Sequence, residues 1–206
     1  MKNIKDNVII QIGGFKRAGK DTISQMIANH YQSKGKLVDI LHYADPLKQI
    51  AATIFNISAE ELDEFKNNKT SLWRFDELEA TFYPVTDFRE ILMKIGNEAI
   101  KPVFGNDVWQ KIMWEKIEKS EAGIIIIPDF RFTVEHIPNA VTIRIVNNDI
   151  TNDTDHASET ELIDFDFDMS IDNTRYHQTQ EEVSYYCEQM IDNYIKQKRG
   201  ENIWKK

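Results

Sequence analysis

The sequence has a single cysteine, Cys187, so no disulfide can form within the chain. Cys187 lies on an apolar stripe with helical spacing, between Val183 and Ile191. A buried small hydrophobic residue is a better interpretation of this position than a nucleophile. Because chains that use no disulfides are typical of reducing compartments, we expect the protein to act in the cytoplasm.

Basic residues are also in short supply, and long apolar runs are missing. The 25 lysines and arginines stand against 34 acidic residues, which gives a formal charge of −9. The chain therefore lacks the general basic surface that binds nucleic acid or anionic lipid. No segment approaches 18 consecutive apolar residues, so we expect neither a signal peptide nor a membrane span. An anionic ligand must be bound by positive charge that is concentrated locally.

Hydrophobic side chains, by contrast, are plentiful. They make up 41% of the 206 residues, which is enough for one sizeable core and excludes collagen-like, low-complexity and largely disordered chains. No internal repeat, flexible linker or long block of charge marks a boundary. We therefore expect a single domain over residues 1–206.

Strand patterns alternate with helical patterns along the chain. Strands are predicted at 8–12, 37–43, 123–127, 141–146 and 164–169. Amphipathic helices are predicted at about 23–31, 45–55, 88–95, 106–117 and 180–195. This alternation indicates an α/β fold of three layers with a mainly parallel central sheet. In such sheets ligands bind beyond the carboxyl ends of the strands.

Three local signals refine this outline. Asp45 followed by Pro46 predicts a helix that begins with Asp45 as its N-cap. Capping boxes are expected at Ser58–Glu61 and Thr179–Glu182. Residues 66–85 show no clean period, so we interpret an insertion at about 58–85 as an irregular, substrate-covering segment.

The strongest motif follows the first predicted strand and opens the first predicted helix. Gly14 and Gly19–Lys20 have the spacing of a P-loop, in which backbone N–H groups converge on phosphate oxygens and the lysine reaches the β- and γ-phosphates. Lys16 and Arg17 add local positive charge. The candidate nucleotide-binding residues here are Gly14, Lys16, Arg17, Ala18, Gly19, Lys20, Asp21 and Thr22.

Asp21 departs from the P-loop pattern, because a serine or threonine normally binds Mg²⁺ at that position and Thr22 comes one residue later. A carboxylate there can bind Mg²⁺ directly or through water. It is equally well explained as an acid in the first turn of a helix, favoured by the helix dipole. Both interpretations remain open.

Four motifs together resemble one family, the bacteriophage deoxynucleoside monophosphate kinases, which are P-loop kinases. The motifs are Gly19-Lys20-Asp21-Thr22, Tyr43-Ala44-Asp45-Pro46-Leu47-Lys48, Asp129-Phe130-Arg131-Phe132 and His156-Ala157-Ser158-Glu159. They occur in the family's order and span most of the chain. The resemblance implies a P-loop kinase fold with helical substrate-binding and lid insertions. It also implies transfer of the γ-phosphoryl group of ATP to a deoxynucleoside 5′-monophosphate with Mg²⁺.

The resemblance also suggests roles for individual residues. Asp129 is similar to a Walker B acid that holds Mg²⁺, and Arg131 is expected to bind phosphate. With Lys20 these form the candidate catalytic set, and Asp21 and Asp129 form the candidate metal set. Asn173 and Arg175 follow the last predicted strand, where P-loop kinases line the adenine pocket. The candidate acceptor-binding residues are Asp45, Lys48, Arg74, Arg89, Trp109 and Arg131.

Ordinary structural explanations compete with several of these roles. Asp129 can cap the following turn, and Arg131 can pair with Glu135. Arg89 and Arg175 can be a surface residue and a turn residue, respectively. At the level of function, a nucleotide-binding switch without phosphoryl transfer, or a kinase for another acceptor such as phosphomevalonate or dephospho-coenzyme A, stays open. A homodimer is possible in either case.

Overall fold

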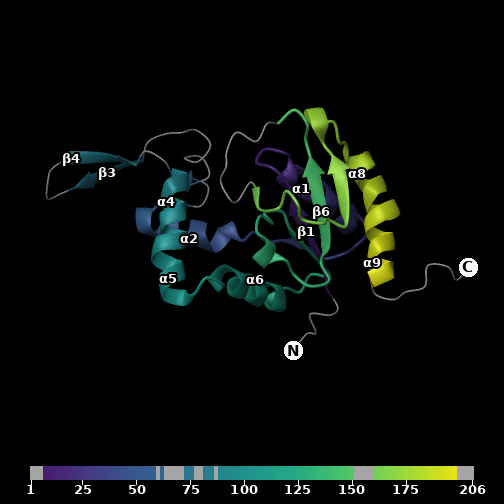
Figure 1. The fold of residues 1–206 in the computed structure, drawn as a ribbon, viewed down its shortest axis with the longest axis horizontal. Helices are drawn as coiled ribbons and strands as arrows, with labels where there is room; N and C mark the ends of the chain where they lie inside the picture. The colour runs from purple at the N-terminus through teal and green to yellow at the C-terminus, as the bar shows by residue number, and fades with distance from the viewer. Residues whose placement is uncertain are drawn as a thin grey trace, which may run out of the picture. The chain divides into compact units, whose positions relative to one another are not determined.

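A computed structural model describes residues 7–58, 61–62, 72–76, 81–85, 88–150 and 160–198, with the backbone alone at 72–76, 81–85, 88–90 and 198 (Figure 1). The chain divides into two compact units. The first, here called the sheet unit, is formed by Met1–His42 and Met113–Lys206. The second is formed by Tyr43–Ile112. Each unit is described by itself.

The sheet unit contains five strands, and every pairing between them is parallel. In the order in which they lie side by side, the strands are β2 (Val38–Ile40), β5 (Ile124–Ile127), β1 (Val8–Gly13), β6 (Val141–Val146) and β7 (Met169–Asp172). The four isoleucines of β5 are all buried, as expected for a strand covered on both faces. The mainly parallel sheet predicted from the sequence is therefore confirmed.

The strand order places the carboxyl end of β1 between those of β5 and β6. Gln11 pairs with Ile127 at the end of β5, and Gly13 pairs with Arg144 near the end of β6. The connection from β1 leads to β2 on one side, whereas the connection from β6 leads to β7 on the other. The carboxyl ends of β1 and β6 thus form a topological switch point, and open α/β sheets bind ligands at such points.

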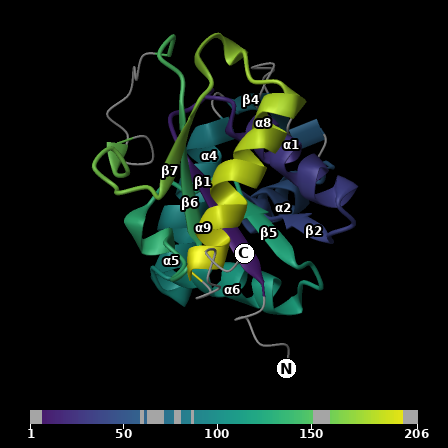
Figure 2. The ribbon, with the colours of Figure 1, turned by 90° about the vertical axis from the view of Figure 1, so that its right-hand side faces the viewer.

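One face of the sheet is covered by helices from the N-terminal and the C-terminal parts of the chain (Figure 2). These are α1 (Lys20–Ser33), α8 (Gln180–Tyr186), the π-helical turn Cys187–Ile191 and α9 (Asp192–Lys198). Ile10 and Ile12 of β1 pack there with Ile27 of α1 and Val183 of α8 in one buried cluster. Cys187 belongs to the same cluster and is fully buried, which confirms its interpretation as a small hydrophobic residue.

The opposite face is covered by the part of α6 (Val108–Lys119) that belongs to the sheet unit. Met113 and Ile117 lie in this part and are buried. With helices on both faces, the sheet unit has the three-layer α/β arrangement expected of a P-loop kinase fold.

The Tyr43–Ile112 unit is mainly helical. It contains α2 (Ala44–Phe55), α4 (Phe88–Lys94), a π-helix (Ile95–Ile100), α5 (Lys101–Phe104) and the antiparallel strands β3 (Leu72–Asp76) and β4 (Thr81–Val85). Ala51, Ala52 and Leu62 form its buried core, against which Leu92 and Ile95 pack. The predicted helix at 88–95 is therefore confirmed, and it extends beyond its predicted end.

Two predictions about strands are wrong. The alternating Asp164–Asp168 segment is not a strand, because β7 begins only at Met169. Its alternation reflects Phe165 and Phe167, which pack edge to face with each other and with Phe130. The 66–85 insertion is not irregular throughout, because β3 and β4 pair within it. A two-stranded ribbon has only edge strands, so it accepts Pro84.

The helix-start predictions are correct in two of three cases. Ser58 and Glu61 exchange hydrogen bonds, and so do Thr179 and Glu182, as capping boxes require. Asp45 is not an N-cap, because α2 begins at Ala44 and Tyr43 holds that position. Asp45 is instead an acid in the first turn, where the helix dipole favours it. None of the helices within the described ranges has the length and hydropathy needed to cross a membrane.

Candidate functional site

The loop between β1 and α1 is shaped by two glycines in conformations that other residues rarely adopt. Gly14 has φ +137° and Gly19 has φ +91°. A Cβ atom at Gly14 would collide with the Ile145 carbonyl oxygen of β6, and one at Gly19 would collide with the Asn173 side-chain amide. Both glycines of the motif are therefore required by backbone conformation and by close neighbours.

Lys20 turns its ammonium group back into this loop. Its Nζ donates to the carbonyl oxygens of Gly14 and Phe15, both at 2.8 Å, and the residue is only 8% exposed. The same residue opens α1, where free backbone N–H groups and the helix dipole favour an anion. Lys16 and Arg17 on the loop are exposed, and Ala18 is buried. Positive charge is thus concentrated at the loop, as an acidic chain requires for phosphate binding.

Asp21 and Thr22 follow Lys20 in the first turn of α1, and both are exposed. The Asp21 carboxylate is 87% exposed, and its Oδ1 lies 3.6 Å from Nε2 of His42. In the described part of the chain, no three histidine, cysteine or acidic side chains form a cluster that could hold a metal ion. Mg²⁺ needs only one or two carboxylates when phosphates and water supply the remaining ligands. Asp21 and Asp129, at the carboxyl edge of the sheet, fit that simpler requirement.

Asp129 and Arg131 lie on the loop that follows β5, and Glu135 fixes the shape of this loop. Oε2 of Glu135 accepts the backbone N–H groups of Arg131 at 2.9 Å and of Phe132 at 3.1 Å. Asp129 and Arg131 are half-buried, and Phe130 between them is fully buried. The backbone of Arg131 is therefore held near the sheet edge by a buried acid.

Gln11 connects this loop to the middle of the sheet. It lies on β1 and is fully buried. Its Nε2 donates to the Glu135 carbonyl oxygen and its Oε1 accepts the Ile137 N–H, both at 2.8 Å. Burial raises the pKa of Glu135 to about 8, and the nearby Asp129 charge adds to this effect, whereas the Arg131 and Phe132 N–H groups oppose it. The pKa of Glu135 therefore lies well above that of an exposed glutamate.

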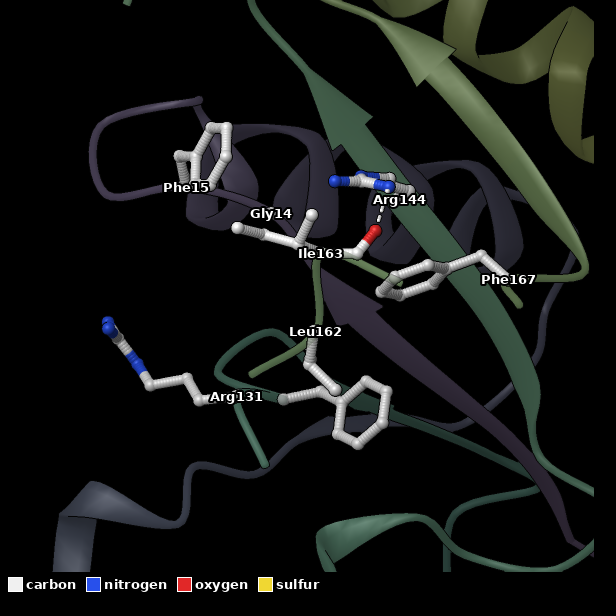
Figure 3. A pocket seen from close by; sticks show the side chains of 8 residues that line it. Gly14, Phe15, Arg131, Arg144, Leu162, Ile163 and Phe167 are labelled. Atoms are coloured by element: carbon white, nitrogen blue, oxygen red, sulfur yellow. Dashed lines mark hydrogen bonds between the residues drawn. The ribbon is translucent and has the colours of Figure 1, made fainter. Parts of the chain in front are cut away.

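A pocket opens at the switch point between β1 and β6 (Figure 3). It combines the start of the glycine loop with two arginines and an apolar wall. Its lining residues are Gly14, Phe15, Phe130, Arg131, Arg144, Leu162, Ile163 and Phe167. Arg131 was predicted from the sequence, whereas Arg144 was not.

The loop after β7 contacts the far end of the glycine loop. Asn173 is 3% exposed, and its Nδ2 donates to the Ala18 carbonyl oxygen at 2.9 Å. The Tyr176 hydroxyl donates to the Arg17 carbonyl oxygen at 2.8 Å. Arg175 is exposed, and its backbone N–H donates to Asp149. The structure thus brings Asn173 to the glycine loop, and it adds Tyr176 to the residues predicted there.

Left-handed backbone conformations gather at the same place. Arg17, Arg175 and Tyr176 have φ values of 67°, 59° and 52°. In the described ranges, the two other non-glycine residues with positive φ are asparagines, which adopt this conformation more readily. Backbone strain of this kind persists where surrounding contacts enforce it, and it is found most often at functional sites.

The remaining predicted residues lie in the Tyr43–Ile112 unit. Asp45 and Lys48 are half-buried on α2, and Trp109 is half-buried on α6, with its ring near Gly96. Arg74 lies on β3 and Arg89 on α4. Their acceptor-binding roles stay predictions. The His156–Glu159 motif lies outside the described residues.

Four residues of the site were missed by the sequence analysis, namely Gln11, Glu135, Arg144 and Tyr176. Two of them carried a signal, because Gln11 and Arg144 are polar residues within strands that are otherwise aliphatic or β-branched. Such positions are where a buried strand makes specific polar contacts. Glu135 and Tyr176 each end a 3-10 helical turn, and the partners that connect them to the rest of the site, Gln11 and Arg17, are far away in the sequence.

Comparison of the chain with protein-family models and with curated proteins found no match in either case.

Proposed function

We propose that the protein is an ATP-dependent kinase that phosphorylates deoxynucleoside 5′-monophosphates to diphosphates. The observation that carries this proposal is the buried Lys20 ammonium, held inside a strand–loop–helix turn whose two glycines cannot be replaced. That arrangement is suited to binding the phosphates of a nucleotide. The choice of acceptor depends on the resemblance of the four sequence motifs to the phage kinases.

Phosphoryl transfer requires mainly that two anionic substrates are aligned and that the shifting charge is neutralised. Lys20 would bind the β- and γ-phosphates, and Arg131 would bind phosphate from the loop after β5. Asp21 and Asp129 would hold Mg²⁺, directly or through water, and the ion would neutralise charge on the phosphates. The oxygen of a monophosphate acceptor is already ionised near neutral pH, so this proposal needs no general base.

The two ends of the donor nucleotide would be bound by different segments. The glycine loop would bind the phosphates, and the Asn173–Tyr176 loop would lie against the base. Its contacts to Ala18 and Arg17 tie it directly to the glycine loop. Asp45, Lys48, Arg74, Arg89 and Trp109 of the Tyr43–Ile112 unit would bind the acceptor. The enzyme would act in the cytoplasm, of an infected host cell if a phage encodes it, as a monomer or a homodimer.

The test is a coupled assay for ADP release with Mg-ATP. The acceptors are dTMP, dGMP, dCMP, dAMP, their ribose counterparts, phosphomevalonate and dephospho-coenzyme A, with a blank that lacks acceptor. Turnover with one or more deoxynucleotides is expected. ATP binding without turnover on any acceptor would contradict the proposal and indicate a nucleotide-binding switch. Turnover with only phosphomevalonate or dephospho-coenzyme A would change the acceptor class.

A further inference from the structure

Arg144 places a second positive charge in the pocket beside Gly14, and neither the motifs nor the proposed function accounts for it. Along β6, Ile143 and Ile145 point to the face of the sheet that α1 and α8 cover. Because side chains alternate along a strand, Arg144 points to the other face. It pairs with Gly13, the residue before the glycine loop. A charged residue in an otherwise apolar or β-branched strand thus lies at the entrance of the candidate phosphate site.

Two contacts hold the Arg144 guanidinium in place. One N–H group donates to the Ile163 carbonyl oxygen at 3.0 Å, and the group lies 5.8 Å from the centre of the Phe167 ring. Figure 3 shows the Arg144 side chain reaching the Ile163 carbonyl, with the Phe167 ring nearby. Phe167 packs against Gly13, where a Cβ atom would lie 2.6 Å from the ring. The missing side chain of Gly13 therefore makes room for the ring beside Arg144.

This anchoring leaves most of the binding capacity of Arg144 unused. A guanidinium has five N–H donors, and in the described part of the chain Arg144 has one hydrogen-bond acceptor and no carboxylate partner. The other arginine of the pocket, Arg131, comes from a different element, the loop after β5. A guanidinium with unused N–H donors beside an apolar wall suits a phosphate group, because the planar fork binds phosphate oxygens bidentately.

We propose that Arg144 is a phosphate-binding residue, and that the pocket that it lines beside Gly14 takes a phosphate group of a phosphorylated substrate. The proposal rests on the kinase function proposed above and adds to it a residue and a subsite. The phosphate group can belong to the monophosphate acceptor or to the γ-position of ATP. Both present the same chemistry to the pocket.

The competing explanation is structural, since Arg144 could simply fasten the 160–168 segment to β6 through Ile163. A fastening role predicts lower stability and a similar loss for every ligand. A binding role predicts weaker affinity for one phosphorylated ligand with unchanged stability. The two roles are therefore distinguished by which ligand is affected.

The experiment compares wild type with Arg144→Gln, Arg144→Lys and Arg144→Ala. Lys36→Gln is the control for the loss of one positive charge, because Lys36 is exposed before β2, at the amino edge of the sheet. Calorimetry gives the Kd for a deoxynucleoside monophosphate, for ATP and for inorganic pyrophosphate. Steady-state assays give each KM, and thermal unfolding gives the melting temperature.

Arg144→Gln is expected to weaken binding of one phosphorylated ligand by about tenfold to a hundredfold, the equivalent of a lost charge-assisted hydrogen bond. Arg144→Lys should lose less affinity for this ligand. Free guanidinium added to Arg144→Ala should partly restore the affinity. An effect confined to the monophosphate assigns the phosphate to the acceptor, and one confined to ATP assigns it to the donor. The melting temperature of Arg144→Gln should equal that of wild type. Lys36→Gln should bind each ligand as tightly as wild type.

Failure of this inference is distinguishable from failure of the kinase proposal. Equal affinities in wild type and Arg144→Gln, with turnover intact, would overturn the role of Arg144 and leave the kinase in place. Pyrophosphate binding that depends on Arg144, in a protein without turnover on any acceptor, would support the pocket and overturn the kinase. A variant that lost stability and all ligands equally, without guanidinium rescue, would show that Arg144 only fastens the segment.

Discussion

Successive residues of β1 and β6 point to opposite faces of the sheet, and the two faces differ in their chemistry. Ile10, Ile12 and Ile143 point to the face covered by α1 and α8, where the core is almost entirely aliphatic. Gln11, Thr142 and Arg144 point to the other face. There Gln11 binds the Glu135–Ile137 backbone, Thr142 binds Asp168, and Arg144 binds Ile163.

This difference separates two tasks within one sheet. The aliphatic face supplies apolar burial, which is non-directional and proportional to area. The polar face supplies directional hydrogen bonds, and those of Gln11 and Arg144 fix segments near the carboxyl edge. We infer that the first face mainly sets stability and that the second mainly positions the candidate site. Four substitutions test this separation, from the largest expected effect to the smallest.

Lys20→Ala tests the glycine loop, which lies at the carboxyl edge of the sheet, where both faces meet. Turnover should fall by about a thousandfold or more, because electrostatic stabilisation is usually the largest catalytic contribution. The melting temperature should stay near that of wild type, since the loop carbonyls that Lys20 now binds can turn to water. Acceptor-dependent ADP release and thermal unfolding measure the two quantities. A large loss of stability with unchanged turnover would remove Lys20 from the mechanism.

Ile27→Ala tests the aliphatic face. Ile27 is fully buried on α1, so its truncation should lower the free energy of unfolding by about 2–5 kcal/mol. The KM values and kcat, measured at a temperature where the variant is folded, should stay within about twofold of wild type. Urea unfolding and steady-state kinetics provide the test. A variant with native stability, or one that is folded but inactive, would contradict the separation of the two faces.

Glu135→Gln tests the polar face through pH. The pKa of Glu135 is raised from 4.5 to about 8 in the folded protein, so between these values the folded state holds a proton that the unfolded state releases. The stability contribution of Glu135 is therefore fully present below about pH 4.5 and is lost as the pH rises to about 8. Glutamine keeps an oxygen that can accept the Arg131 and Phe132 N–H groups but does not titrate.

Relative to Glu135→Gln, the wild type should thus become progressively less stable between pH 5 and pH 8. Urea unfolding at pH 5.5, 7.0 and 8.5 measures this difference. Glu118→Gln is a matched control, because Glu118 is exposed. Parallel stability curves for wild type and Glu135→Gln would show that Glu135 does not titrate in this range.

Tyr176→Phe should have the smallest effect. It removes one hydrogen bond to the Arg17 carbonyl oxygen and keeps the ring. A neutral hydrogen bond contributes about 0.5–1.5 kcal/mol, so the KM for ATP should rise about two- to tenfold with kcat unchanged. Arg175→Ala provides the comparison, because the family resemblance suggests Arg175 as a residue that contacts the base. A larger increase in the KM for the acceptor than in the KM for ATP would indicate that this loop binds the acceptor.

Much of the sheet unit was predictable because its signals are local. The β5 run of isoleucines, the apolar stripe around Cys187 and the Thr179 capping box each lie within a few residues, and each is confirmed. The alternating Asp164–Asp168 segment misled, because Phe165 and Phe167 are half-buried by packing against Phe130 rather than by strand pairing. An alternating sequence pattern indicates which side chains are shielded from water. It does not indicate whether a neighbouring strand or another side chain shields them.

The candidate site divides in the same way. The spacing of Gly14, Gly19 and Lys20 was sufficient to predict the strand–loop–helix turn in which both glycines have positive φ, because that conformation depends on consecutive residues. Arg144 and Tyr176 were not predicted as part of it. Their partners, Ile163 and Arg17, lie 19 and 159 residues away in sequence, and such pairs become neighbours only when the chain folds.

The sequence by itself determined the class of fold, the order of the strands and helices of the sheet unit along the chain, and the loop at Gly14–Lys20, because each depends on periodicity or on spacing within one turn. The tertiary structure decided which strands are neighbours, which face of the sheet is polar, and which distant residues surround the loop. These depend on long-range packing and on burial of groups such as Glu135, whose protonation is set by an environment that the unfolded chain does not have.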